Sequence, residues 1–129
     1  MPSLFTKIVN GEIPAYKVAE NDEFLAFLDI FPLAKGHVLC IPKIETDYIF
    51  DLDDEVLSRL MVFSKSVAKK MDKVLDCKRI GVAVIGLEVP HAHVHLVPLQ
   101  SVEDINFSRE KLKFSPDEME EVRDLIAKA

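Results

Sequence analysis

The stretch His91-Ala92-His93-Val94-His95 holds three of the four histidines in a chain of 129 residues. Successive side chains of a β-strand point to opposite faces, so on a strand the three imidazoles share one face. Ala92, Val94 and Leu96 then share the other face, which can enter an apolar core. The pattern predicts a strand over His91 to Leu99 that presents its histidines on an accessible side.

Runs of apolar and β-branched residues bounded by turn residues predict four more strands. The expected ranges are Tyr16 to Ala19, Phe24 to Asp29, His37 to Ile41 and Arg79 to Ile85. Glu20-Asn21-Asp22 forms a tight turn between the first two, and Pro42 stops the third. Because short links join neighbouring strands, the sheet is expected to be mainly antiparallel.

Helical periods occur in three places. A long helix is predicted from apolar residues at steps of three and four, with Asp53 or Asp54 as its cap: Val56, Leu60, Phe63, Val67, Met71 and Val74. Ser115-Pro116-Asp117-Glu118 is a capping box that starts a last helix, which runs to near Lys128. Ser3 caps a short N-terminal turn that ends at Asn10-Gly11. The fold class is α+β, in one domain over residues 1–129.

Composition excludes several classes of function. Apolar residues make up 49% of the chain and charged residues 29%, as in a folded globular protein. The net charge of −6 argues against a nucleic-acid partner. The longest apolar run, Ile80 to Leu87, is too short to span a membrane. Without a signal pattern, and with Cys40 and Cys77 expected to stay reduced, a cytoplasmic location is expected.

Three readings of the triad compete: a structural role, a metal site and a nucleophile. Histidines at i and i+2 of a strand can hold zinc, although Glu88 is the nearest candidate carboxylate. A neutral imidazole is also a nucleophile near pH 7, and its neighbours can donate hydrogen bonds to phosphoryl oxygens. Gly81 and Gly86 have P-loop spacing, but Leu87-Glu88 stand where Lys and Ser or Thr are required.

The triad and three segments before it together resemble the histidine-triad nucleotide-binding family, in its Hint-like branch. The matching segments are His91 to Val97, Leu4 to Pro14, Phe27 to Ile30 and Gly36 to Lys43, in the family's order and spacing. The resemblance covers about residues 3–98. The C-terminal tail, residues 99–129, lies outside it and is expected to be helical.

The resemblance implies a five-stranded antiparallel sheet with a long helix, which dimerises into a ten-stranded sheet. It also implies hydrolysis or transfer at the α-phosphate of a nucleotide through a covalent nucleotidyl-histidine, with His93 as the nucleophile. His95 and His37 match phosphate-site histidines, and the backbone carbonyl of His91 orients His93. Asp29 matches the carboxylate that holds the ribose hydroxyls. The positions that match the apolar cleft around base and ribose are Phe5, Ile8, Phe27, Ile30 and Leu39.

Three departures from the family pattern bear on metal and substrate. Ser3, Thr6 and Glu45 replace residues that bind structural zinc in many Hint-like members, so no metal and no other cofactor is expected. The loop before the triad, residues 84–90, is shorter than usual. Glu88 replaces a small hydroxyl residue on the leaving-group side, where a negative charge would disfavour an anionic leaving group.

The sequence thus predicts a homodimeric hydrolase of nucleoside monophosphate derivatives, with phosphoramidates and adenylylated amines as the expected substrates. The alternatives are a dinucleoside polyphosphate hydrolase, a nucleotide-binding or regulatory module with little activity, and a metal-binding protein.

Overall fold

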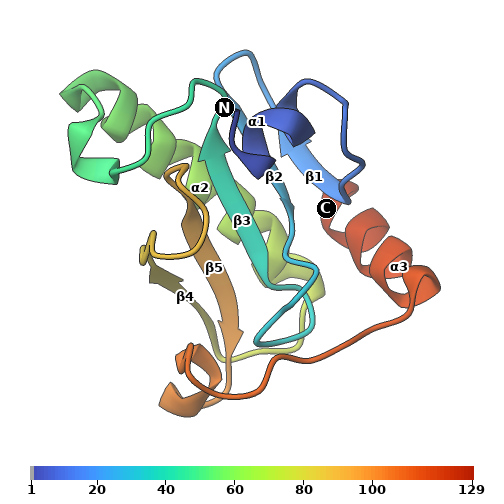
Figure 1. The fold of residues 1–129 in the computed structure, drawn as a ribbon. Coiled ribbons are helices and arrows are strands. Elements are labelled where there is room, and N and C mark those ends of the chain that lie inside the picture. The colour runs from blue at the N-terminus through green and yellow to red at the C-terminus, as the bar shows by residue number, and fades with distance from the viewer. Residues whose placement is uncertain (1) are drawn as a thin grey trace.

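The computed structural model describes residues 2–129, and its five strands form one antiparallel sheet in the order β1-β2-β3-β5-β4 (Figure 1). The strands are β1 (Lys17–Glu20), β2 (Phe24–Leu28), β3 (Val38–Pro42), β4 (Arg79–Ala83) and β5 (Val94–Leu99). The pairing of β3 with β5 brings Leu39 opposite His95, although 56 residues separate them in the chain. The α+β class and the antiparallel sheet are as predicted.

Three helices and two 3₁₀ turns complete the fold: α1 (Leu4–Val9), η1 (Ile49–Asp51), α2 (Asp54–Val74), η2 (Val102–Ile105) and α3 (Pro116–Ala127). Ser3 and Ser115 cap α1 and α3 with their side chains, as predicted. Asp53 occupies the N-cap position of α2, but its side chain makes no capping hydrogen bond. Within residues 2–129, no helix combines the length and apolar character needed to cross a membrane.

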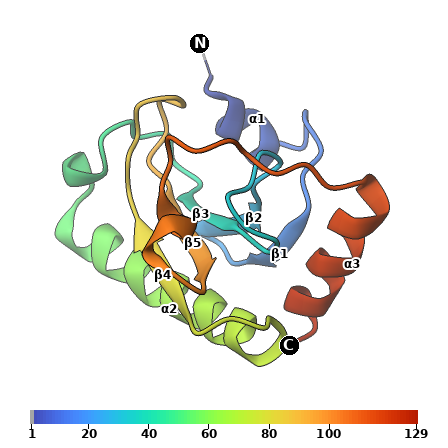
Figure 2. The same ribbon diagram turned by 90° about the horizontal axis from the view of Figure 1, so that it is seen from below.

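The two faces of the sheet bury separate apolar clusters. Leu60, Val67 and Met71 of α2 pack with the strand residues on one face, among them Val94 and Leu96. Helix α1 lies on the side of the sheet opposite α2 (Figure 2). A smaller cluster is buried on this other face: Phe5, Ile8, Leu25, Phe27, Leu39 and Ile41. The side chains of β5 therefore alternate as predicted, because Val94 and Leu96 face α2 whereas His95 faces the α1 side.

Strand β5 is shorter than the sequence predicts, because it begins at Val94 instead of His91. Its ladder with β3 ends at the pair Cys40 and Val94. The amide of Ala92 instead donates to the carbonyl of Thr46, at 2.7 Å, so the chain leaves the ladder for the loop after β3. Similarly, β4 ends at Ala83 and not at Ile85.

The two edges of the sheet differ. Helix α3 packs beside the β1 edge, whereas no strand within residues 2–129 pairs with the outer side of β4 (Figure 1). The apolar face of α2 does not need a second copy to cover it, because the sheet already buries Leu60, Phe63 and Val67. Exposed apolar side chains remain along β4, the segment after it and α2: Val82, Val84, Ile85, Met61 and Val62.

We expect this open edge to pair with a second copy, because an unpaired apolar edge strand invites strand addition. Light scattering at micromolar concentration should give twice the monomer mass of 14.6 kDa. Val82→Lys should shift the protein toward monomer, since Val82 is half exposed on β4. Val102→Lys, on the exposed turn η2, is the matched control and should leave the dimer intact. A monomeric wild type would contradict the prediction.

Candidate active site

His91 lies just before β5 and is completely buried, with both ring nitrogens hydrogen-bonded. Its Nε2 lies 2.8 Å from the carbonyl oxygen of Pro42, which can only accept, so Nε2 carries the proton. Nδ1 therefore accepts from the hydroxyl of Ser3, at 2.8 Å. The sequence grouped His91 with the histidines of an accessible surface, and that expectation is wrong. The ring of His91 anchors the loop before β5, and its backbone carbonyl contacts the His93 ring.

The same backbone sets the orientation of the His93 ring. Nδ1 of His93 lies 2.7 Å from the carbonyl oxygen of His91, to which it must donate. The proton of a neutral His93 thus sits on Nδ1, and Nε2 keeps its lone pair. The ring is 6% exposed, and the Phe5 ring meets it edge-on at a centroid distance of 5.1 Å. His93 consequently presents one free nitrogen in a fixed orientation.

His37 and His95 form a hydrogen-bonded pair whose protons are also fixed. The backbone amide of Leu33 donates to Nδ1 of His37 at 3.0 Å, so the His37 proton sits on Nε2. That nitrogen lies 3.0 Å from Nδ1 of His95, which must accept. The proton of a neutral His95 therefore sits on Nε2. The ring centroids of His93 and His95 are 4.8 Å apart. The two rings differ, because His93 offers the lone pair of its Nε2 whereas His95 offers an Nε2–H.

The conformation at Gly36 places His37 at the start of β3. Gly36 has a φ of 92°, in the left-handed region that favours glycine. A Cβ there would lie only 2.7 Å from Cδ1 of Leu75. The turn needs glycine for its backbone conformation, whereas the flexible end of Leu75 could shift to make room for a Cβ. The turn brings His37 within hydrogen-bond distance of His95.

Burial keeps the imidazoles neutral. Loss of hydration is the main reason that the pKa of His37 and of His95 falls to about 3, and the Lys111 ammonium contributes to both shifts. Burial also lowers the pKa of His91 and of His93. At neutral pH the site therefore holds uncharged rings, which is the protonation state that a nucleophilic imidazole requires.

Asp29 lies at the end of β2 beside this pair. Its Oδ2 is 3.7 Å from Nε2 of His37, and its Oδ1 accepts from the amide of Phe31 at 2.8 Å. Burial raises the pKa of Asp29 to about 6, and the negative charge of Glu88 adds to this effect. Asp29 is therefore ionised at neutral pH while His37 is neutral, so the two do not form an ion pair.

Asp29, His37 and His95 also have the composition of a metal site, with potential ligand atoms within 4.8 Å of one another. The proton positions oppose that role. Nδ1 of His37 already accepts from Leu33, so coordination through Nε2 would require an anionic imidazolate. The arrangement instead favours a ligand that accepts hydrogen bonds, such as a phosphoryl group.

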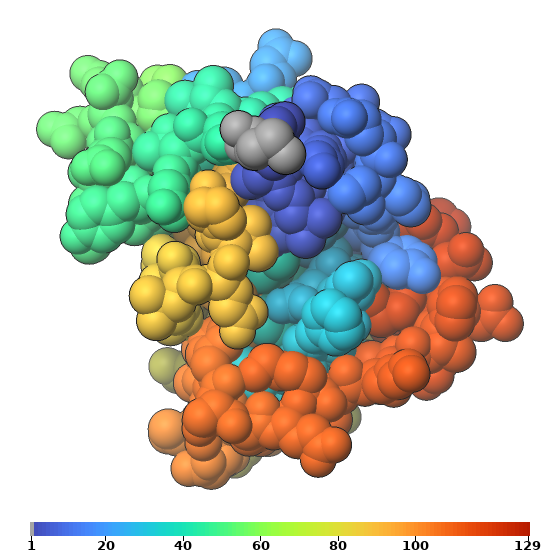
Figure 3. All heavy atoms as spheres, in the orientation of Figure 1, coloured from blue at the N-terminus to red at the C-terminus, as the bar shows by residue number. Residues whose placement is uncertain are grey.

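Four of the five cleft residues named from the sequence gather on the α1 side of the sheet. Phe5, Ile8, Phe27 and Leu39 are buried together, whereas Ile30 is 58% exposed. In Figure 3 the surface is hollowed between α1 in dark blue, the yellow segment before the triad and the orange C-terminal segment. His93 and His95 are the triad members with residual exposure, so the site opens on this face.

The residues at the family's zinc positions form a hydrogen-bonded cluster around His91. Oε1 of Glu45 accepts from the amide of Ser3 at 2.6 Å and from the hydroxyl of Thr6 at 2.7 Å. The Ser3 hydroxyl completes the cluster by donating to His91. These contacts fasten α1 to the loop before β5, and their protein donors and acceptors satisfy one another.

Sequence reasoning missed the contribution of the C-terminal segment. Phe107 meets the His95 ring at a centroid distance of 4.6 Å, and Lys111 supplies a positive charge that acts on His37, His95 and Asp29. No motif surrounds these residues, so only the fold reveals their place. Glu88, which the sequence did single out, is exposed, yet its charge partly offsets the lowering of the His93 pKa by burial.

Known proteins are similar to this chain in sequence and in fold. The HIT domain profile matches residues 10–102. A HIT-like protein of Borreliella burgdorferi is 33% identical over 127 residues, which cover 92% of this chain and 91% of the relative. The adenosine 5'-monophosphoramidase of Saccharomyces cerevisiae is 40% identical over 97 residues, covering 74% of this chain and 61% of the relative.

A solved structure agrees with the sequence matches. The HIT-like protein of Bartonella henselae superposes with a TM-score of 0.83 at 29% identity, covering 98% of this chain and 95% of the other. The domain match spans most of the chain and includes all four histidines of the site. The chain therefore belongs to the HIT family, the histidine-triad proteins that its sequence resembles.

Proposed function

We propose that this protein hydrolyses nucleoside monophosphate derivatives at the α-phosphate, with His93 as a covalent nucleophile. The observation that carries the proposal is the ordered set of protons: His93 offers a free Nε2 lone pair beside a His95 that offers an Nε2–H. An attacking atom and a hydrogen-bond donor for the phosphoryl oxygens are the two groups that this reaction needs.

The reaction balances with these groups and water. The Nε2 lone pair of His93 forms a bond to phosphorus while the bond from phosphorus to the leaving nitrogen breaks. That nitrogen keeps the electron pair, takes a proton from water and departs as an amine. A hydroxide or water then attacks phosphorus, the bonding pair returns to Nε2, and the nucleoside monophosphate leaves. The Nδ1–H bond to the His91 carbonyl stabilises the positive ring of the intermediate.

Substrate binding is proposed on the same face. The Asp29 carboxylate accepts hydrogen bonds from the ribose hydroxyls, and the buried apolar cluster under α1 packs against the base and the ribose. Phosphoramidates are the proposed substrate class, supported by the name of the yeast relative. Dimerisation through the β4 edge and a cytoplasmic location belong to the same proposal, the latter supported by the free thiols of Cys40 and Cys77.

His93→Ala should abolish turnover of adenosine 5'-phosphoramidate, by about three orders of magnitude or more, because the bond-forming atom is lost. Nucleotide affinity should change only a few-fold, since Asp29 and the apolar set remain. Mass spectrometry of wild type quenched in denaturant at alkaline pH, where the bond from phosphorus to the imidazole survives, should show one added nucleotidyl group, which the variant lacks. Undiminished turnover in His93→Ala would refute the mechanism.

Glu88 should favour phosphoramidates over dinucleoside polyphosphates, because its charge acts on His93 and repels an anionic leaving group. Glu88→Ser should narrow the ratio of kcat/KM between the two substrate classes, by about two- to tenfold. Glu121→Ser, which removes an equal charge from exposed α3, is the control. An unchanged ratio in Glu88→Ser would show that this carboxylate has no role in selectivity.

The neutral histidines should also make the fold sensitive to acid. Between pH 6.5 and about 3 the unfolded chain binds protons at His37 and His95 that the folded protein does not. The free energy of unfolding therefore falls as the pH drops, by about 1.4 kcal/mol per pH unit for each such histidine. Asp29 acts in the opposite direction below pH 6, because the folded state there binds the extra proton.

His95→Asn should thus reduce the slope of stability against pH between 6.5 and 4.5, whereas Asp29→Asn should make it steeper. Urea unfolding followed by circular dichroism at several pH values measures both slopes. Parallel curves for wild type and His95→Asn would contradict the assignment of a neutral buried imidazole.

A further inference from the structure

The segment after β5 crosses the α1 side of the sheet before it reaches α3 (Figure 2). Its start is fixed by η2, where Oδ2 of Asp104 accepts from the amides of Gln100 and Ser101, at 2.7 and 3.0 Å. Most of it lies beyond residue 102, where the match to the HIT domain ends. Residues 106–112 are here named the strap.

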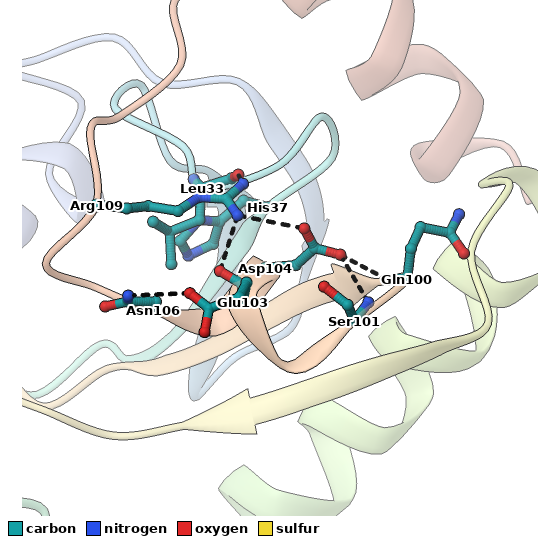
Figure 4. A network of polar contacts seen from close by, with 8 residues as sticks. All are labelled: Leu33, His37, Gln100, Ser101, Glu103, Asp104, Asn106 and Arg109. Atoms are coloured by element: carbon teal, nitrogen blue, oxygen red, sulfur yellow. Dashed lines mark hydrogen bonds and ion pairs between the residues drawn. The ribbon is translucent and has the colours of Figure 1, made fainter.

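Arg109 is the centre of the strap's contacts (Figure 4). Its Nη1 donates to the carbonyl of Glu103 at 2.8 Å and to Oδ1 of Asp104 at 3.3 Å. Its Nη2 donates to the carbonyl of Leu33 at 3.0 Å. The planar guanidinium therefore joins the turn η2 to the loop between β2 and β3, with 76 residues between Arg109 and Leu33.

The strap makes a second contact with the peptide group that joins Pro32 to Leu33. The amide of Leu112 donates to the carbonyl of Pro32 at 2.8 Å. That carbonyl belongs to the same peptide group as the Leu33 N–H, which donates to Nδ1 of His37 at 3.0 Å. A peptide group that accepts at its oxygen is polarised and becomes a better donor at its nitrogen. The strap thus orients and strengthens the bond that decides the His37 proton position.

We propose that Arg109 is a positioning residue, which holds Leu33 so that its amide keeps the proton of His37 on Nε2 and, through His37, the proton of His95 on the nitrogen that faces substrate. The chain of contacts runs without a gap from Arg109 through Leu33 and His37 to His95. The catalytic consequence rests on the proposed function, whereas the proton positions do not.

Phe107 supports the same arrangement from the other side. Its ring lies 4.6 Å from the His95 centroid and 6.2 Å from the His37 centroid, and its carbonyl accepts from Nζ of Lys111 at 2.6 Å. The strap therefore covers the pair of histidines with an aromatic ring while it clamps the loop beneath them. Both contacts are lost together if the strap moves away.

The test compares Arg109→Met with Arg123→Met. Arg123 is on α3, pairs with Asp124, and has 32% of its side chain exposed against 33% for Arg109, so it is a matched control. Long-range ¹H–¹⁵N correlation spectra of the ¹⁵N-labelled full chain report which ring nitrogen of each histidine carries the proton. Steady-state kinetics with adenosine 5'-phosphoramidate supply kcat and KM.

In wild type and Arg123→Met we expect His37 and His95 each as one Nε2–H tautomer. In Arg109→Met we expect mixed tautomers at His37, a kcat about tenfold lower and a KM within about twofold. Arg109→Lys keeps the charge without the planar fork and should fall between the two. A single unchanged His37 tautomer in Arg109→Met would overturn the inference.

Two other outcomes are possible, and each still decides the role of Arg109. If Arg109→Met does not fold, the spectrum of Arg109→Lys decides the question in its place, by the same criterion. If wild type does not hydrolyse the phosphoramidate, the proposed function fails, and the tautomers of His37 and His95 still decide the role of Arg109.

Discussion

A neutral imidazole has two nitrogens and one proton, and in this site the backbone decides which nitrogen holds it. The carbonyl of His91 fixes the proton of His93, the carbonyl of Pro42 fixes that of His91, and the amide of Leu33 fixes that of His37. Backbone groups are suited to this task because each can only donate or only accept. The chemical difference between otherwise identical side chains is thus set by the polarity of the groups around them.

Burial keeps each imidazole neutral, so each ring retains a single proton in a defined position. In water, an imidazole exchanges protons freely and charges below about pH 6.5. Here desolvation lowers the pKa of each of the four rings, so each keeps one proton near neutrality. The charged groups are the Asp29 carboxylate, 3.7 Å from His37, together with Glu88, which acts on His93, and Lys111, which acts on His37 and His95.

Three separate segments hold the backbone groups in place. Glu45 fastens the start of α1 to the loop after β3, and Ser3 joins α1 to His91. Gly36 admits the left-handed turn that brings His37 within hydrogen-bond distance of His95. The strap clamps Pro32 and Leu33 from the C-terminal side. Because these segments meet only in the folded chain, the site depends on the whole domain and not on the triad alone.

The sequence by itself determined the α+β class, the amphipathic face of α2, the caps at Ser3 and Ser115, and the family. These follow from local periodicity and from short motifs, which neighbouring residues carry. Tertiary structure alone decided that His91 is buried, that β5 starts at Val94, that Ile30 is exposed and that Arg109 reaches Leu33. Each of these depends on a hydrogen bond or contact between residues far apart in the chain. A local pattern holds no information about such a partner, because the partner is set by how the strands and loops pack.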